Sequence, residues 1–278
     1  MEPLEILTVV GARPQFVKAA AVSRAVAEHN GRDGRPIRER IVHTGQHYDE
    51  NMSAVFFEQL RIPEPAANLE VGSGPHGQQT ARMLERLEAR MLDDRPDRVL
   101  IYGDTNSTLA AALAAAKLHV PIAHVEAGLR SFNRRMPEEI NRVVADHLSD
   151  LLLCPTPAAV NNLAAEGVGR GVHQVGDVMY DSVLFNRRLA EQSSQALQRL
   201  GLTDGSYYLA TIHRAENTDD PTRLAGIVAA LERMETTVVL PLHPRTRKTL
   251  GAATGSPGGR IRAIEPVAYL DMLMLLQH

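Results

Sequence analysis

The sequence predicts an α/β protein with two Rossmann-like domains, each built on a parallel sheet. Three observations support this fold class. Short apolar runs rich in β-branched residues alternate with helical segments, beginning with "EILTVVG" at residues 5–11. The runs are continuously apolar, which is typical of parallel strands covered by helices on both faces. The chain has 278 residues, enough for two domains of ordinary size, and glycines cluster at residues 167–182, where a linker is expected.

The first domain is predicted over residues 1–175. It opens with a strand at 5–11 and a helix at 14–30, and Pro14 suits the first turn of that helix. The same alternation then predicts strands at 38–44, 98–103, 121–126 and 151–154, and helices at 51–60, 77–92, 106–118, 137–150 and 157–167.

The second domain is predicted over residues 176–278 and has the same organisation. Its expected strands are 207–213, 236–243 and 260–266, and its expected helices are 182–201, 220–234, about 245–252 and 267–278. The sequence stops inside the last apolar helix, without a glycine or proline that would end it. We therefore expect the second domain to be incomplete, in a chain truncated at its C-terminal side.

Composition excludes several classes of partner. The formal net charge of −3 provides no basic surface for nucleic acid or for an anionic membrane. No apolar run reaches the roughly 18 residues that a membrane span needs, and the N-terminus lacks a signal-peptide pattern. These features indicate a cytoplasmic protein with a small-molecule partner. The single cysteine, Cys154, ends an apolar run and is expected in the core rather than as a catalytic thiol.

Charges of both signs crowd one connection, "HVEAGLRSFNRRMPEEINR" at residues 124–142. One interpretation is a solvated loop followed by ion pairs along a helix. Glu126 favours another, because it ends a strand that is expected to be buried, where an unpaired carboxylate is costly. Either Arg130 or Arg142 neutralises it, or it is an acid or base with a shifted pKa.

Other polar residues follow other strands. Because ligands of open parallel sheets bind outside the carboxyl ends of the strands, these positions are candidate site residues. Arg13 and Lys18 could hold a phosphate at a helix N-terminus, or could be two exposed cations. Asp104 could cap the next helix or take part in catalysis. The remaining candidates at strand ends are Gln46, His47, His213, Glu216, Asn217, His243 and Arg245.

No cofactor or metal is expected. Only Gly11 occupies a glycine position of the G-x-G-x-x-G fingerprint, which disfavours a dehydrogenase. His43 and His47 are four apart, but the intervening residues follow a strand, and only a helix would place both on one face. No zinc-ligand spacing and no Ser-His-Asp pattern is evident.

Eight motifs taken in order resemble the non-hydrolysing UDP-N-acetylglucosamine 2-epimerases. They are "GARPQFVK", "TGQHYD", "YGDTNSTLA", "HVEAGLR", "MPEEINR", "VGDVMYDS", "TIHRAEN" and "LHPRTRK". The resemblance covers essentially the whole chain. It implies a glycosyltransferase-B-like architecture, usually a homodimer, with a UDP-sugar between the domains. It also implies inversion at C2 without NAD or metal, through elimination of UDP to 2-acetamidoglucal and re-addition, in the service of polysaccharide biosynthesis.

The resemblance also implies residue roles. Asp104, Glu126 and Glu138 become candidate acid or base carboxylates, and Arg142 becomes a partner that orients or stabilises charge. Glu139, adjacent to Glu138, is expected to be structural. Contacts to the UDP-sugar are implied for Arg13, Lys18, Gln46, His47, His213, Glu216 and Asn217, with His213 also a catalytic candidate.

The substrate is left open between two sugars. UDP-N-acetylglucosamine is the first expectation because most of the family acts on it. The stretch "SFNRRMPEE" is closer to the branch that acts on UDP-2,3-diacetamido-2,3-dideoxyglucuronate, in which Arg134 or Arg135 could meet the uronate carboxylate. A glycosyltransferase of the same architecture is a further alternative. The family's Ser-Gly-Gly segment, which completes the UDP site, would lie beyond His278.

Overall fold

The computed structural model describes residues 2–32, 34–46, 63–212, 215–242 and 259–278, and of residues 215 and 216 only the backbone. The predicted helices at 51–60 and about 245–252 lie outside these ranges, as do His47, His213, His243 and Arg245. The chain divides into two compact units, Met1–Ser182 and Val183–His278. The boundary predicted near residue 175 falls just before helix α7 (Val178–Ser193), which contributes residues to both units.

The first unit contains a seven-stranded sheet whose strands are all parallel and follow the order β3-β2-β1-β4-β5-β6-β7. The strands are β1 (Leu4–Val10), β2 (Ile37–His43), β3 (Ala67–Asn68), β4 (Arg98–Tyr102), β5 (Ile122–Val125), β6 (Leu151–Cys154) and β7 (Val172–Gln174). The order reverses between β1 and β4, so loops on either side of this point diverge and leave room for a ligand.

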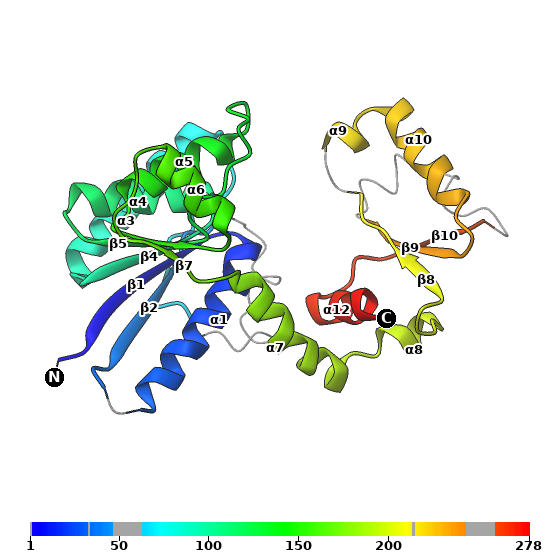
Figure 1. Ribbon diagram of the computed structural model, residues 1–278, viewed down its shortest axis with the longest axis horizontal. Coiled ribbons are helices and arrows are strands. Elements are labelled where there is room, and N and C mark those ends of the chain that lie inside the picture. Colours follow the sequence, from blue (N-terminus) through cyan, green and yellow to red (C-terminus); the bar gives the residue numbers. More distant parts are fainter. Residues whose placement is uncertain (1, 33, 47–62, 213–214, 243–258) are drawn as a thin grey trace. The chain divides into compact units, whose positions relative to one another are not determined.

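Helices cover both faces of this sheet, as predicted from the continuously apolar pattern of its strands. They are α1 (Arg13–Asn30), α3 (His76–Asp94), α4 (Asn106–Lys117), α5 (Pro137–Leu148) and α6 (Pro157–Ala165). Figure 1 shows α3, α4 and α5 on one face and α1 on the other. Helix α4 contacts both α3 and α5. Its buried face consists largely of alanines, and such small side chains let neighbouring helices approach closely.

The second unit contains a three-stranded parallel sheet in the order β10-β9-β8. Its strands are β8 (Tyr207–Leu209), β9 (Thr237–Pro241) and β10 (Ile261–Ile264), and its helices are α8 (Ala196–Leu200), α9 (Ala215–Thr218), α10 (Pro221–Glu232) and α12 (Tyr269–Gln277). Asp220 caps α10 by accepting hydrogen bonds from the amides of Thr222 and Arg223. The predicted fold class, α/β with two parallel sheets, is confirmed.

Three details of the prediction are wrong. The glycine-rich stretch taken as a linker contains strand β7 and the start of α7, and β3 was not predicted at all. Both strands are too short for a hydrophobic pattern to reveal them. The single helix expected at 182–201 is two helices, α7 and α8, because the Ser194 hydroxyl accepts a hydrogen bond from the Ala196 amide and donates one to Asp271.

We predict that Gly128→Ala destabilises the first unit much more than Gly167→Ala. Both glycines have φ of +79°, but a Cβ at residue 128 would lie 2.8 Å from the Ala159 carbonyl carbon, whereas one at residue 167 meets nothing within 4 Å. The conformational strain alone costs about 1 kcal/mol, and the added overlap should bring the loss at residue 128 to about 3 kcal/mol or more. Urea unfolding measures both; equal losses would contradict the close approach of backbone at Gly128.

Candidate active site

The ends of β1 and β4 are joined by a buried glutamine. The Oε1 atom of Gln15 accepts hydrogen bonds from the amides of Gly11 (2.8 Å) and Ala12 (3.0 Å), and its Nε2 atom donates to the Tyr102 carbonyl at 2.8 Å. Gln15 therefore ties the first turn of α1 to the strand that precedes Asp104. The sequence analysis did not single out this residue, because glutamine in a first helical turn is common at solvent-exposed positions.

Lys18 pairs with Glu126. Lys18 lies in α1 and is only 7 % exposed, and its ammonium forms an ion pair with Glu126 Oε2. The alternative in which Arg130 or Arg142 neutralises Glu126 is therefore wrong, and so is the alternative in which Lys18 is an exposed cation. Burial lowers the pKa of Lys18, although Asp104 and Asp177 act in the opposite direction.

The backbone at Glu126 adopts an unusual conformation. Its φ is +72°, in the left-handed region that non-glycine residues rarely occupy. The amides of Glu126 and Ala127 both donate to the Leu153 carbonyl, which holds this turn against β6. Strained backbone of this kind persists only where the surroundings enforce it, and it is common at active sites. A cavity of about 170 Å³ opens beside Glu126, and Asp177 and Asp181 are among its lining residues.

Asp104 pairs with Arg142. The Arg142 guanidinium reaches from α5 to Asp104 Oδ2, and the Asn141 amide nitrogen donates to the Asp104 carbonyl at 2.9 Å. Asp104 does not cap the following helix, because Thr105 does so with its hydroxyl. The capping alternative is therefore wrong, and the Asp104 carboxylate at the strand end is still a candidate for catalysis.

Glu138 and Glu139 differ in environment although they are adjacent. Glu138 is half-buried, and its carboxylate makes no hydrogen bond or ion pair with any residue that the structure describes. It lies one turn before Arg142, a spacing that places both on the same face of α5. Glu139 is buried and accepts hydrogen bonds from the Ser131 amide, the Ser131 hydroxyl and the Phe132 amide, at 2.8–2.9 Å.

Glu139 has the structural role that was expected for it. Besides the loop, it contacts Arg142 at 3.2 Å, so that one carboxylate orients both the 131–132 backbone and the cation that meets Asp104. Burial opposes its ionisation, but the hydrogen bonds from Ser131 and Phe132 outweigh burial and lower the pKa of Glu139.

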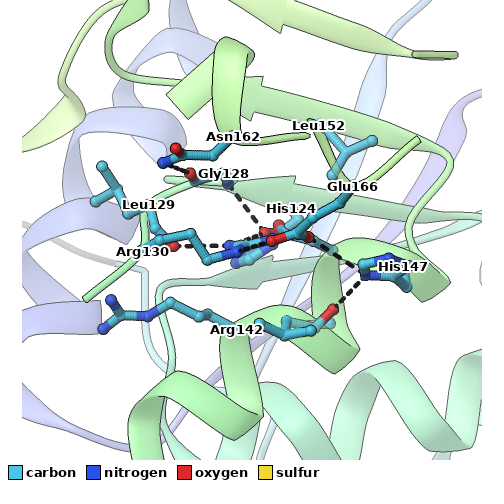
Figure 2. A network of polar contacts seen from close by, with 12 residues as sticks. His124, Gly128, Leu129, Arg130, Arg142, His147, Leu152, Asn162 and Glu166 are labelled. Carbon is cyan, nitrogen blue, oxygen red and sulfur yellow. Dashed lines mark hydrogen bonds and ion pairs between the residues drawn. The ribbon is translucent and has the colours of Figure 1, made fainter. Parts of the chain in front are cut away.

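A second network of charged residues is centred on Asp146, and the sequence analysis did not predict it. Asp146 of α5 accepts hydrogen bonds from His124 (2.7 Å), from the Gly128 amide (3.0 Å) and from Arg130 (2.7 Å). Arg130 also forms a bidentate pair with Glu166, both contacts at 2.7 Å, and these two side chains face each other in Figure 2. Burial opposes ionisation of Asp146, but its donors lower its pKa.

The other predicted residues are placed as follows. Gln46 is half-buried and its Oε1 atom accepts a hydrogen bond from the Ser107 hydroxyl at 2.7 Å. Arg13 is half-buried at the first position of α1, while Arg134 and Arg135 are exposed in the loop before α5. Asn217 lies in α9 of the second unit, and the side chain of Glu216 is outside the described part.

Cys154 is buried in a core cluster, where burial raises its pKa to about 11.

No cluster of three or more His, Cys, Asp or Glu side chains suited to a metal ion occurs among the described residues. None of the helices that the structure describes is both long and apolar enough to cross a membrane.

Two parallel-sheet units in succession, with ion-paired carboxylates at the strand ends of the first, are the α/β organisation of glycosyltransferase-B-like proteins. The family described as UDP-N-acetylglucosamine 2-epimerase matches residues 30–278. The chain belongs to this family and is an isomerase, a UDP-sugar 2-epimerase.

Three similar proteins support the assignment. The UDP-2,3-diacetamido-2,3-dideoxy-D-glucuronate 2-epimerase of Pseudomonas aeruginosa is 54% identical, over 99% of this chain and 76% of the relative. A UDP-N-acetylglucosamine 2-epimerase homolog of Methanococcus maripaludis is 48% identical, over 98% of this chain and 76% of the relative. The crystal structure of Methanocaldococcus jannaschii UDP-GlcNAc 2-epimerase with UDP-GlcNAc and UDP is 42% identical, with a TM-score of 0.83, and covers 97% of this chain and 75% of that one.

We predict that Glu139→Gln lowers the free energy of unfolding by about 1–3 kcal/mol at pH 7, because an amide replaces the charged acceptor of several hydrogen bonds. The pKa of Glu139 is lowered in the folded state, so this contribution is fully present above its ordinary value of 4.5 and is lost as the pH falls through the lower folded value. Urea unfolding at neutral and acidic pH measures the difference. Glu138→Gln is the matched control and should change stability by less than about 0.5 kcal/mol; equal effects of the two variants would refute the structural role of Glu139.

Proposed function

We propose that this protein epimerises a UDP-linked 2-acetamido sugar at C2 by eliminating and re-adding UDP. One observation carries this proposal: two carboxylates, Asp104 and Glu126, follow adjacent strands, and each is held by a cation from a different helix. A third carboxylate, Glu138, shares a helix face with Arg142 and has no partner in the described part of the chain. This arrangement supplies several proton-handling groups at one edge of the sheet.

The reaction requires these groups because the C2 proton is only weakly acidic. A base removes that proton, the C1–O bond breaks with its electron pair passing to the UDP oxygen, and a C1–C2 double bond forms. UDP then attacks C1 again while an acid delivers a proton to the opposite face of C2. Asp104, Glu126 and Glu138 are our candidates for base and acid. Arg13, Lys18 and His213 are our candidates for stabilising charge on the departing diphosphate.

The substrate that we favour is UDP-2,3-diacetamido-2,3-dideoxyglucuronate. The relative named for this sugar is 54% identical to the chain, compared with 48% and 42% for two relatives named for UDP-N-acetylglucosamine. Arg134 and Arg135 are exposed just before α5, where a guanidinium is free to meet a uronate carboxylate. UDP-N-acetylglucosamine, the first expectation from the sequence, is the second candidate, because most of the named relatives carry its name.

Proton NMR in deuterated water tests both parts of the proposal. The full-length gene product is incubated with each sugar in turn, without any acceptor, and deuterium at C2 is followed together with the gluco to manno change. Deuterium should enter the diacetamido-glucuronate faster than N-acetylglucosamine. The opposite order would reverse the substrate assignment, and no incorporation with either sugar would overturn the epimerase reading in favour of a transferase.

We expect Glu126→Gln to reduce C2 exchange by about 100-fold or more, because an amide can neither accept nor deliver the proton. UDP binding, measured by calorimetry, should stay within about threefold, since the fold and the cations remain. Glu85→Gln, a substitution at an exposed position of α3, is the matched control and should leave exchange unchanged. Exchange retained in Glu126→Gln would reduce Glu126 to a structural carboxylate.

The alkaline limit of activity should depend on Lys18. Its pKa is lowered by burial, so a required ammonium loses its proton at a pH below the ordinary value of 10.5, and activity should fall there. Lys18→Arg keeps a cation up to about pH 12 and should shift the alkaline limb of kcat upward. Because the guanidinium fits the lysine site poorly, its maximal kcat should fall by about tenfold. An alkaline limb that stays in place in Lys18→Arg would show that another group sets it.

A homodimer stays a prediction. A surface that a second copy could cover is formed by Phe132, Met136 and Ile140, which are 79%, 38% and 51% exposed. Phe132 and Ile140 also line a cavity of about 710 Å³ beside α5.

A further inference from the structure

His124 is fully buried, and each of its ring nitrogens faces an acceptor. Its Nε2 atom lies 2.8 Å from the Gly103 carbonyl oxygen, and its Nδ1 atom lies 2.7 Å from Asp146 Oδ1. A carbonyl oxygen only accepts, so Nε2 carries a proton. The other oxygen of Asp146 accepts from the Gly128 amide and from Arg130, which is the environment of an ionised carboxylate. An ionised carboxylate only accepts, so Nδ1 carries a proton as well.

The ring therefore joins the two strand ends that carry the candidate catalytic carboxylates. Gly103, which receives one of its hydrogen bonds, directly precedes Asp104 and has φ of +59°. His124 itself lies in β5, two residues before Glu126, which directly follows this strand. The Gly103 amide also donates to the Val125 carbonyl at 3.1 Å, so the Gly103 peptide is held on both sides by β5.

Asp146 connects the same ring to α5. Arg142, the partner of Asp104, lies one turn before Asp146 on this helix. The Gly128 amide and Arg130, both bound to Asp146, belong to the segment that follows Glu126. Movement of the ring would thus disturb the approach of Arg142 to Asp104 and the turn that presents Glu126.

We propose that His124 and Asp146 form a buried imidazolium–carboxylate pair that positions Asp104 and Glu126 relative to each other, so that His124 is a positioning residue for the 2-epimerase reaction. This inference rests on the proposed function. His124 needs no contact with the sugar, because it acts through the Gly103 peptide and through Asp146.

Two substitutions separate the two hydrogen bonds of the ring. His124→Asn can keep a donor near the Nδ1 position, toward Asp146, and loses the donor to Gly103. His124→Gln can keep a donor near the Nε2 position, toward Gly103, and loses the donor to Asp146. Both should lower kcat by about tenfold or more, with KM and the Kd for UDP within about threefold, because misplaced catalytic groups slow chemistry more than they weaken binding.

His119→Asn is the matched control. His119 is exposed in the turn before β5 and has φ of +58°, a conformation that asparagine tolerates well. This variant should keep the kcat of the unsubstituted enzyme. Circular dichroism of every variant checks folding.

The decisive experiment combines kinetics with a spectroscopic signature in the full-length gene product. In protein labelled with ¹⁵N at histidine, both ring nitrogens of His124 should appear protonated under the conditions of the kinetic assay, because each faces an acceptor. A single protonated nitrogen would overturn the ion pair. Unchanged kcat in folded His124→Asn and His124→Gln would overturn the positioning role, whereas absence of C2 exchange in the unsubstituted enzyme would overturn the proposed function itself and this role with it.

Discussion

A carboxylate at the end of a buried strand has to be paired, and this constraint organises the first unit of the protein. The sheet is parallel and covered on both faces, so β4, β5 and β6 are largely buried along their lengths. Three acidic residues there or on the covering helix each meet a cation: Glu126 meets Lys18, Asp104 meets Arg142, and Asp146 meets Arg130. Removing one partner from such a pair would leave an uncompensated charge, so each pair fixes the position of both elements that carry it.

Helix α5 supplies one residue to each of two of these pairs, Arg142 and Asp146. This one helix carries four charged residues with different roles. Glu138 is a carboxylate without a partner in the described part of the chain, Glu139 holds the preceding loop, Arg142 is the cation that meets Asp104, and Asp146 is a buried acid. The alanine-rich α4 lets α5 pack closely beside it, and Asn141 adds a hydrogen bond to the Asp104 carbonyl. The mixed charge of the 124–142 connection is therefore the result of joining one helix to several strand ends at once.

The sequence predicts the fold class, the principal strands and the location of chemistry at strand ends, because hydrophobic periodicity and the geometry of parallel sheets are local and general rules. It does not predict the partners. Lys18 and Glu126 are separated by 108 positions, and nothing near either residue indicates the other. Arg130 and Arg142, the partners that the sequence suggested for Glu126, are much nearer to it in the chain than Lys18 is. For the same reason the sequence analysis did not identify His124. Its two hydrogen bonds reach Gly103 at the end of another strand and Asp146 on a helix. Family resemblance identified Asp104, Glu126 and Glu138 as candidates without saying how each is held.

The central claim is that the C1–O bond of the UDP-sugar breaks and re-forms during inversion at C2. Positional isotope exchange tests it directly: the substrate carries ¹⁸O in the bridge between C1 and the β-phosphorus, and ³¹P NMR follows the label. If UDP is eliminated and re-added, the label should scramble into the non-bridging positions as C2 inverts. Inversion at C2 with the label retained in the bridge would mean that the bond never breaks, and would contradict the mechanism assigned to these carboxylates.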